Sequence, residues 1–234
     1  MKPIVKNTEE HDISKWIAGE LPDGYQNMVY VDTMCGNLGV FLRKQRSKLE
    51  VLNDTSNSLI QIYRAIRDEN SDFAKKLYNV KCTQESFQKY LSNNSKPFED
   101  YLDKAVNEFV VRKLSRGENK TAFANKHVDW KKVAKELLDL HSRLSETFIM
   151  NREPIEVIQK FNSAEAVLYH SICHPQKDQQ MSKLAASLKN FQGKVIVSSS
   201  DQRLYKQFFE SWNLKRKMFT KLNKRKLHYI WKNF

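Results

Sequence analysis

Residues 28–54 constrain the fold of this chain more than any other stretch does. Two apolar runs, Met28–Val31 and Leu49–Leu52, enclose a turn with an acid and glycines over residues 32–39, followed by a short helical start. Asp54 follows the second run and completes the pattern. Strand, glycine turn, helix, strand and acid form the order of a nucleotide-type βαβ unit, in which the turn brings backbone amides close to a ligand. The stretch therefore predicts an α/β fold with a parallel sheet.

The rest of the chain predicts a helical part inserted into this core. Residues 72–149 hold short helical patterns with scattered aromatic side chains, which we expect to form a core rather than a platform for stacking bases. The last helix of this part is expected over 128–150. We therefore expect an α/β core formed by 1–71 and 150–234, interrupted by a mostly helical insert at 72–149. The elements expected in the second part of the core are strands at 166–171, 194–197 and 227–231 and helices at 179–190 and 200–212.

Positive charge is the main feature of the composition. The chain has 40 Lys and Arg against 27 Asp and Glu, a net charge of +13. Such an excess favours polyanions, most simply nucleic acid, through the release of counterions. The three cysteines, Cys35, Cys82 and Cys173, form no metal-ligand or disulfide pattern and indicate a reducing compartment. The start has no signal-peptide pattern and no apolar run reaches membrane-spanning length, so we expect a soluble, intracellular protein without a metal or a membrane partner.

Several short segments, in order along the chain, resemble the motifs of one family. Val31–Leu42 is similar to V-E-P-F-x-G-G-G-S-V-F-L, Glu50–Asp54 to E-V-I-N-D, and Gly193–Ser198 to G-K-V-I-L-S. The family is that of the Dam-type adenine-specific DNA methyltransferases, which use S-adenosylmethionine (SAM) and act on an adenine flipped out of DNA. The resemblance implies a Rossmann-like SAM-methyltransferase core with helices on both faces of its sheet, and an insert that recognises DNA. The remaining similar segments are Lys15–Glu20, Ser115–Gly117, Asn151–Glu153 and Leu227–Phe234.

The family's catalytic motif, D-P-P-Y, is degraded in this sequence. The adenine amine is a poor nucleophile, so an acidic or amide side chain and a backbone carbonyl must accept its hydrogens, while the aromatic ring stacks on the base. Aligned on Pro175, the motif becomes Cys173–Gln176. Neither this alignment nor the one from Tyr169 supplies an Asp or Asn, so we expect methyl transfer to be lost; the alternative is that His174 acts as a base. Aligned from Tyr169, the positions of the degenerate motif are Ser171, Ile172, Cys173 and His174.

The expected SAM site keeps some residues and has lost others. Leu38 stands where the family has a glycine, and its side chain is expected to fill space that the methionine part of SAM needs. Met34 replaces an aromatic residue, and Glu20 replaces a basic one. We therefore expect no cofactor, with SAM as the cofactor if the site still functions. The residues that the resemblance assigns to the cofactor are Trp16, Asp32, Gly36, Asp54 and Glu153.

Basic side chains gather in two parts of the sequence. One part includes the segment that resembles the family's DNA-contacting region, and the other follows Glu210, after which there is no acidic side chain. The resemblance implies that the second part forms a terminal β-hairpin, whose charge can follow a phosphate backbone. The residues expected to bind nucleic acid are Arg112, Lys113, Ser115, Arg116, Lys120, Lys126, Lys215, Arg216, Lys217, Lys221, Lys224, Arg225 and Lys226.

Three functions are consistent with these observations. The first is a catalytically inactive methyltransferase-like protein, a pseudoenzyme, that binds nucleic acid through a basic face, DNA rather than RNA, alone or with a protein partner. The second is an active but diverged SAM-dependent adenine methyltransferase. The third is a structural subunit of a protein or ribonucleoprotein assembly, whose partner covers the basic surface. We predict the first, because the catalytic and cofactor motifs are degraded together.

Overall fold

The structure is a computed structural model that describes residues 9–94, 97–117, 120–172, 178–201, 206–221 and 224–234. Its described residues form two compact units. The α/β unit comprises residues up to Thr55 and again from Thr147 to Phe234, and the helical unit comprises Ser56–Glu146. Among the described residues, no helix is long and apolar enough to cross a membrane.

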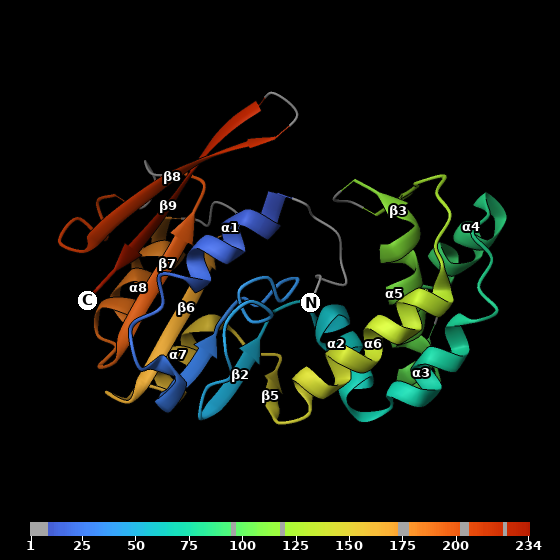
Figure 1. Ribbon diagram of the computed structural model, residues 1–234, viewed down its shortest axis with the longest axis horizontal. Coiled ribbons are helices and arrows are strands. Elements are labelled where there is room, and N and C mark those ends of the chain that lie inside the picture. Colours follow the sequence, from blue (N-terminus) through green and yellow to red (C-terminus); the bar gives the residue numbers. More distant parts are fainter. Residues whose placement is uncertain (1–8, 95–96, 118–119, 173–177, 202–205, 222–223) are drawn as a thin grey trace. The chain divides into compact units, whose positions relative to one another are not determined.

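The α/β unit is built on a seven-stranded mixed sheet (Figure 1). Its parallel part begins with the two strands predicted around residues 28–54, which pair in register from Val29↔Leu49 to Asp32↔Leu52. The last two strands form an antiparallel hairpin that pairs with the parallel part through a single strand. In sheet order the strands are β5 (Thr147–Met150), β2 (Leu49–Asn53), β1 (Val29–Asp32), β6 (Ala166–Ile172), β7 (Lys194–Ser199), β9 (Lys224–Lys232) and β8 (Asn213–Lys221).

Helices lie on both faces of this sheet, with α1 in front and α7 and α8 behind in Figure 1. Alternate residues of the parallel strands, among them Val31, Leu168 and Val195, are fully buried in a core shared with α7 and α8. An α/β fold with a mostly parallel sheet is thus confirmed, and it is compatible with a Rossmann-like arrangement. The helices of this unit are α1 (Glu9–Ala18), the short 3₁₀ helix η1 (Tyr25–Asn27), α7 (Pro154–Lys160) and α8 (Asp178–Lys189).

Three local predictions for the α/β unit are wrong. Residues 40–42 form successive turns instead of starting a helix, because the Arg43 amide bonds to the Val40 carbonyl while the Arg43 side chain takes the Gly39 carbonyl, which interrupts the series of helical bonds. Residues 206–212 also form turns rather than a helix, with Phe209 packed between Trp212 and Trp231 at ring distances of 4.7 and 6.1 Å. Residues 147–150 form β5 rather than the end of a helix, since buried and exposed side chains alternate there.

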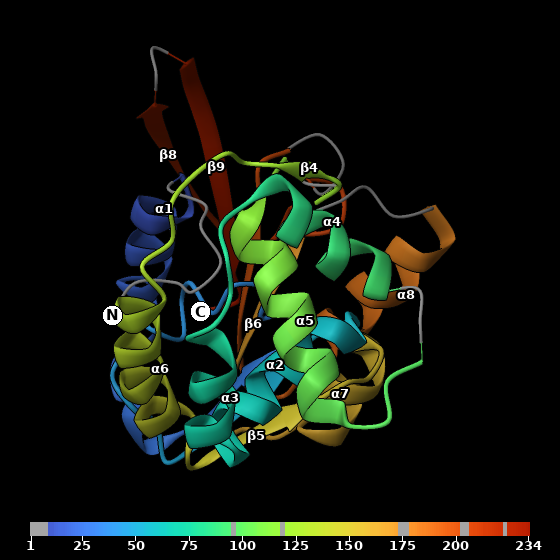
Figure 2. The ribbon, with the colours of Figure 1, turned by 90° about the vertical axis from the view of Figure 1, so that its right-hand side faces the viewer.

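The helices of the helical unit pack against one another (Figure 2), with α2 in contact with both α5 and α6. Phe73, Phe87 and Phe109 are fully buried in this unit, so the prediction of an aromatic core is confirmed for these three, whereas Tyr78 and Tyr101 are exposed. The unit begins at Ser56, earlier than the predicted residue 72, because the apolar face of α2 packs against α5 and α6. Its elements are α2 (Asn57–Asp68), α3 (Asn70–Leu77), α4 (Gln84–Asn93), α5 (Tyr101–Leu114), the paired strands β3 (Ser115–Arg116) and β4 (Ala122–Phe123), and α6 (Trp130–Leu144).

Candidate functional site

The connection between β1 and β2, residues 33–48, crosses the carboxyl edge of the sheet, where nucleotide-type ligands bind in such folds. Its first backbone amides donate hydrogen bonds within the chain. The amide of Met34 donates to Oδ1 of Asp32 (3.3 Å), that of Cys35 to the carbonyl of Asn53 (2.8 Å), and that of Gly36 to Oδ2 of Asp54 (3.0 Å). In a nucleotide-type βαβ unit, backbone amides of this turn bind the ligand. Here they are bonded to the chain itself.

The two strand-end acids of the expected cofactor site are both buried. The side chain of Asp32 accepts a hydrogen bond from the Tyr30 hydroxyl (3.3 Å), and only 1% of the residue is exposed. Burial raises the pKa of Asp32 to about 8, because desolvation penalises the charged carboxylate. Asp54 is 7% exposed and receives the Gly36 amide. Asp32 is therefore mostly protonated at neutral pH and is poorly suited to hold a cationic amino group.

Asn53 joins the ends of β2 and β5, a role that the sequence analysis did not assign to it. Its amide Nδ2 donates to the carbonyls of Thr33 (3.0 Å) and Arg152 (2.9 Å), and its Oδ1 accepts the Arg152 amide (2.9 Å). Asn151 adds a bond from its Nδ2 to the carbonyl of Asp54 (2.7 Å). Glu153, which the resemblance assigns to the cofactor site, is exposed at the start of α7. The polar residues at this edge therefore fix the strand ends to one another.

A buried Thr–His pair lies at the neighbouring strand end and was also missed by the sequence analysis. Oγ1 of Thr33 is 2.7 Å from Nδ1 of His170 in β6 and 3.2 Å from the carbonyl of Tyr169. Burial lowers the pKa of His170 to about 4, so its ring is neutral at physiological pH. Because its ring is neutral and hydrogen-bonded to Thr33, His170 is a core residue of the fold.

Leu38 takes part in closing this edge. It has a positive φ of 65°, a conformation that favours glycine, and its side chain is 1% exposed. Its amide donates to the carbonyl of Cys35 (2.8 Å), which closes a tight turn over residues 35–38 that includes Gly36. The position keeps the backbone shape of a glycine-rich loop, but a leucine side chain occupies the interior.

The degenerate catalytic stretch begins at the end of β6. Ser171 is half-buried there, and Ile172 is buried in the core with Met181 and Leu184 of α8. Cys173 and His174 lie outside the described residues. The position that corresponds to a proline of the family motif is thus a core isoleucine.

Trp16 and Glu20, expected near the cofactor, contact the hairpin instead. The Trp16 ring packs against Phe219 and His228 at centroid distances of 5.8 and 6.4 Å. Glu20 accepts hydrogen bonds from Lys215 (2.7 Å) and Lys232 (3.0 Å). Partial burial pushes the pKa of Glu20 upward, but these bonds lower it overall. The acid that replaces a basic family residue therefore serves as an anchor between α1 and the hairpin.

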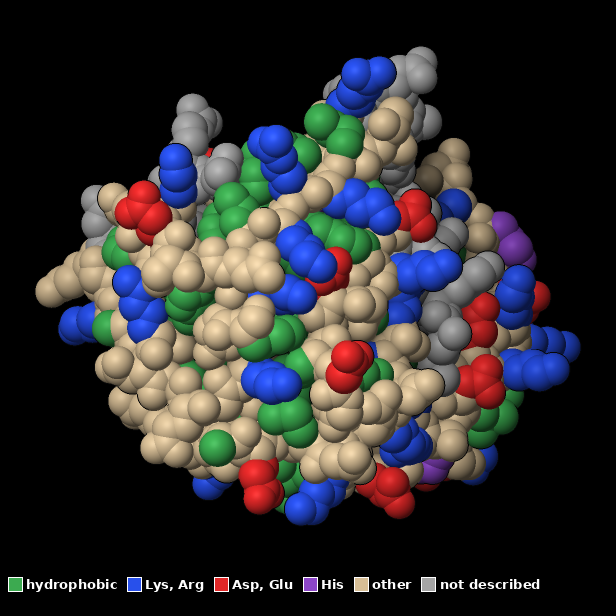
Figure 3. Space-filling view, turned by 60° about the vertical axis from the view of Figure 1, so that its left-hand side comes forward, with side chains coloured by type: hydrophobic (Ala, Val, Ile, Leu, Met, Phe, Trp, Pro, Cys, Tyr) green, Lys and Arg blue, Asp and Glu red, His purple; other side chains and the backbone are tan. Residues whose placement is uncertain are grey.

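The β8–β9 hairpin extends beyond the rest of the sheet (Figure 1). β7 pairs only with residues 229–232 of β9, whereas β8 pairs with β9 over residues 213–221. The outer half of the hairpin is therefore a two-stranded ribbon with no third strand among the described strands. Space-filling Figure 3 shows Lys and Arg side chains with hydrophobic side chains between them where the hairpin projects.

Side chains on the hairpin alternate between two faces. The face that contacts α1, here called the α1 face, carries Lys215, Lys217, Phe219, Lys226 and His228. The opposite face, here called the arginine face, carries Arg216, Met218, Thr220, Arg225 and Leu227. The predicted basic residues are thus divided between the two faces; nothing is described of the side chains of Lys221 and Lys224.

The predicted basic residues of the helical unit have different environments. Arg112 is largely buried: its Nη2 donates to Oγ of Ser58 (2.8 Å), and its Nε lies 3.8 Å from the Glu108 carboxylate. Lys113 lies over the Phe109 ring at 5.4 Å. Arg112 therefore packs within the unit rather than presenting its charge to a phosphate. The other residues of the set are Arg116, which is exposed, and Ser115, Lys120 and Lys126, which are half-buried.

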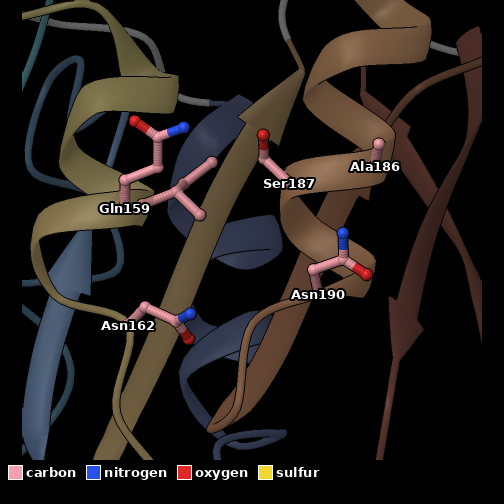
Figure 4. A pocket seen from close by; sticks show the side chains of 6 residues that line it. Gln159, Asn162, Ala186, Ser187 and Asn190 are labelled. Carbon is pink, nitrogen blue, oxygen red and sulfur yellow. The ribbon is translucent and has the colours of Figure 1, made fainter.

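A hollow of about 180 Å³ lies between α7 and α8 (Figure 4). It is lined by uncharged side chains, including Gln159, Asn162 and Asn190. Cofactor pockets are larger, roughly 300–1,000 Å³. Because α7 and α8 end just before β6 and β7 begin, Asn162 and Asn190 lie towards the amino ends of these strands, away from the edge where ligands bind in α/β folds.

Comparison of the sequence with models of known protein families gives no match, and comparison with curated proteins gives none either.

Proposed function

We propose that this chain is a methyltransferase-like protein that binds double-stranded DNA through its β8–β9 hairpin and does not transfer methyl groups. The observation that carries the proposal is the charge of the hairpin. Arg216, Lys217, Arg225 and Lys226 are exposed, and none has an ion-pair partner among the described residues. Cations held on a projecting ribbon without acidic partners can neutralise phosphates and release counterions.

The absence of methyl transfer is proposed from the carboxyl edge of the sheet. The amides of residues 34–36 are bonded within the chain, Asp32 is buried with a raised pKa, and the Leu38 side chain occupies the turn. At the catalytic position, the Ser171 hydroxyl is a much weaker acceptor than a carboxylate for the hydrogens of an adenine amine. The protein therefore lacks free amides and an ionised acid for the cofactor, and it lacks a strong acceptor for the reacting base.

The DNA-binding part of the proposal is tested by fluorescence anisotropy with a labelled duplex. For roughly four phosphate contacts we expect affinity to fall about 100-fold between about 50 and 200 mM salt. The triple substitution of Lys224, Arg225 and Lys226 by Ala should weaken binding to all sequences and reduce the salt slope by about one for each of these cations that contacts a phosphate.

A matched control removes the same charge elsewhere in the α/β unit. Lys160, Lys183 and Lys189 are exposed on α7 and α8, and their triple replacement by Ala should leave affinity within about threefold of wild type, because distant charges are screened. Equal losses from the two triple variants would remove the hairpin from the proposal.

The catalytic part is tested by calorimetric titration with SAM, with and without duplex DNA, and by transfer of a labelled methyl group to DNA. We expect no heat of SAM binding in the titration and no transfer of the labelled methyl group to DNA. SAM binding in the micromolar range together with transfer would restore the active, diverged methyltransferase.

A further inference from the structure

We infer that the arginine face of the hairpin, rather than its α1 face, contacts DNA, and that it does so in the major groove of a B-form duplex. This inference rests on the proposed function and adds to it the contact face and the kind of duplex.

The α1 face is partly occupied by the protein itself. Trp16 of α1 packs against Phe219 and His228 of this face. Glu20 binds Lys215 at 2.7 Å, so part of the positive charge of this face is neutralised. The ammonium group of Lys217 lies 5.7 Å from the centroid of the Phe219 ring. A phosphate approaching from this side meets a helix and a carboxylate.

The outer part of the arginine face offers its groups to solvent, whereas Leu227 and Tyr229 of the same face pack in or against the core of the α/β unit. Arg216 and Arg225 are exposed and have no ion-pair partner among the described residues. Met218 is 51% exposed between them, and Thr220 is exposed as well. Guanidinium groups bind phosphate oxygens in a bidentate way and are better suited to this contact than lysine ammonium groups.

The positions of the two arginines fit a groove with a phosphate backbone on each side. Arg216 lies in β8 and pairs with Tyr229, whereas Arg225 lies in β9 and pairs with Thr220, so each strand of the ribbon carries one arginine. A ribbon that lies along the roughly 12 Å wide B-DNA major groove therefore directs one arginine towards each wall. With one arginine at each wall, Met218 faces the base edges, where the thymine methyl group is the apolar contact.

The same geometry selects DNA over double-stranded RNA. The B-form major groove admits a two-stranded β-ribbon, and the outer half of the hairpin is such a ribbon. The major groove of A-form RNA is too deep and narrow for side chains to read. A hairpin that binds in this groove should therefore discriminate between the two kinds of duplex.

The inference is tested with two double variants that remove equal charge from the two faces. Arg216→Ala/Arg225→Ala changes the arginine face, and Lys217→Ala/Lys226→Ala changes the α1 face. Affinity is measured by anisotropy for one sequence prepared as a DNA duplex and as an RNA duplex, and circular dichroism checks that each variant is folded. We expect the variant of the arginine pair to bind DNA about tenfold or more weakly than wild type, and the variant of the lysine pair about threefold or less. Each phosphate contact that is removed should also flatten the salt slope by about one.

The outcomes separate this inference from the proposed function. Equal losses from the two pairs, or a larger loss from the lysine pair, would overturn the choice of face while leaving DNA binding by the hairpin intact. Equal affinity of the wild type for DNA and RNA duplexes would overturn the major-groove geometry. A wild-type protein that binds neither duplex would overturn the proposed function itself.

Discussion

The β1–β2 connection and the β8–β9 hairpin treat their polar groups in opposite ways. In the connection, amides, carboxyls and Lys44 are bonded to other groups of the chain and buried. On the hairpin, the cations of the arginine face are exposed and lack ion-pair partners among the described residues. A buried polar group must be paired because desolvation is costly, whereas an exposed cation stays available for an external anion. The first region therefore maintains the fold, and the second is suited to binding.

This contrast predicts where substitutions have their effect. Changes in the β1–β2 connection should alter the free energy of unfolding and leave DNA affinity unchanged. Changes on the hairpin should alter DNA affinity with little effect on stability, as in the variants proposed above.

The largest effect is expected from Lys44→Met. Nζ of Lys44 pairs with Glu50 and donates to the carbonyl of Gln45 (2.9 Å), and its side chain is fully buried over the Tyr30 ring at 4.2 Å. The substitution leaves the Glu50 carboxylate buried without its cation, so we expect a loss of about 3–5 kcal/mol in the free energy of unfolding, measured by urea denaturation.

A double variant, Lys44→Met/Glu50→Gln, provides the control for this prediction. It removes both charges and should recover much of the lost stability, because no isolated charge remains buried. The DNA affinity of every folded variant in this set should equal that of the wild type. A change in affinity without a change in stability would show that the connection contributes to binding.

The second-largest expected effect is a change in the free energy of unfolding with pH, which Asp32 causes. Its pKa is about 8 in the folded protein and about 3.9 when unfolded, so between these values the folded state binds more protons. Stability should therefore fall as pH rises, by about 1.5 kcal/mol between about pH 6.5 and 8. His170 and His228, whose pKa values burial lowers to about 4, act in the opposite direction and only below about pH 6.5.

Asp32→Asn isolates this contribution, because the amide is close in shape and does not ionise. Urea denaturation at several pH values should give a flat profile for Asp32→Asn and a falling one for the wild type between about pH 6.5 and 8. The same fall in both proteins would mean that another group causes it.

The sequence was sufficient for the parts of the fold that depend on local patterns. The apolar runs at Met28–Val31 and Leu49–Leu52 predicted the two parallel strands, and the helix predicted at 179–190 is α8, whose Met181, Leu184 and Leu188 are buried at helical spacing. These patterns repeat within a few residues, so burial can be inferred from spacing alone. The four-residue strand β5 was missed, because its alternation is too short to separate from the helical pattern before it.

The site depended on contacts that spacing does not contain. Asn53 bonds to Arg152, and Thr33 lies against His170, although these partners are about a hundred or more residues apart in sequence. Likewise, the division of the hairpin cations between two faces follows from the β8–β9 register. Composition predicted a basic region but could not say which of its cations already had a partner.

The smallest predicted effect concerns Glu20, the residue that links α1 to the hairpin. Its bonds to Lys215 and Lys232 are partly exposed, so Glu20→Gln should cost at most about 1 kcal/mol of stability. It also removes a negative charge beside the hairpin, so DNA affinity should rise by about two- to fivefold at low salt and return towards the wild-type value as salt screens the field. Glu165→Gln is the matched control, since Glu165 is exposed and lies 3.9 Å from Lys48, away from the hairpin. A similar gain from both variants would mean that net charge alone governs affinity, whereas a gain confined to Glu20→Gln would place the bound DNA at the hairpin.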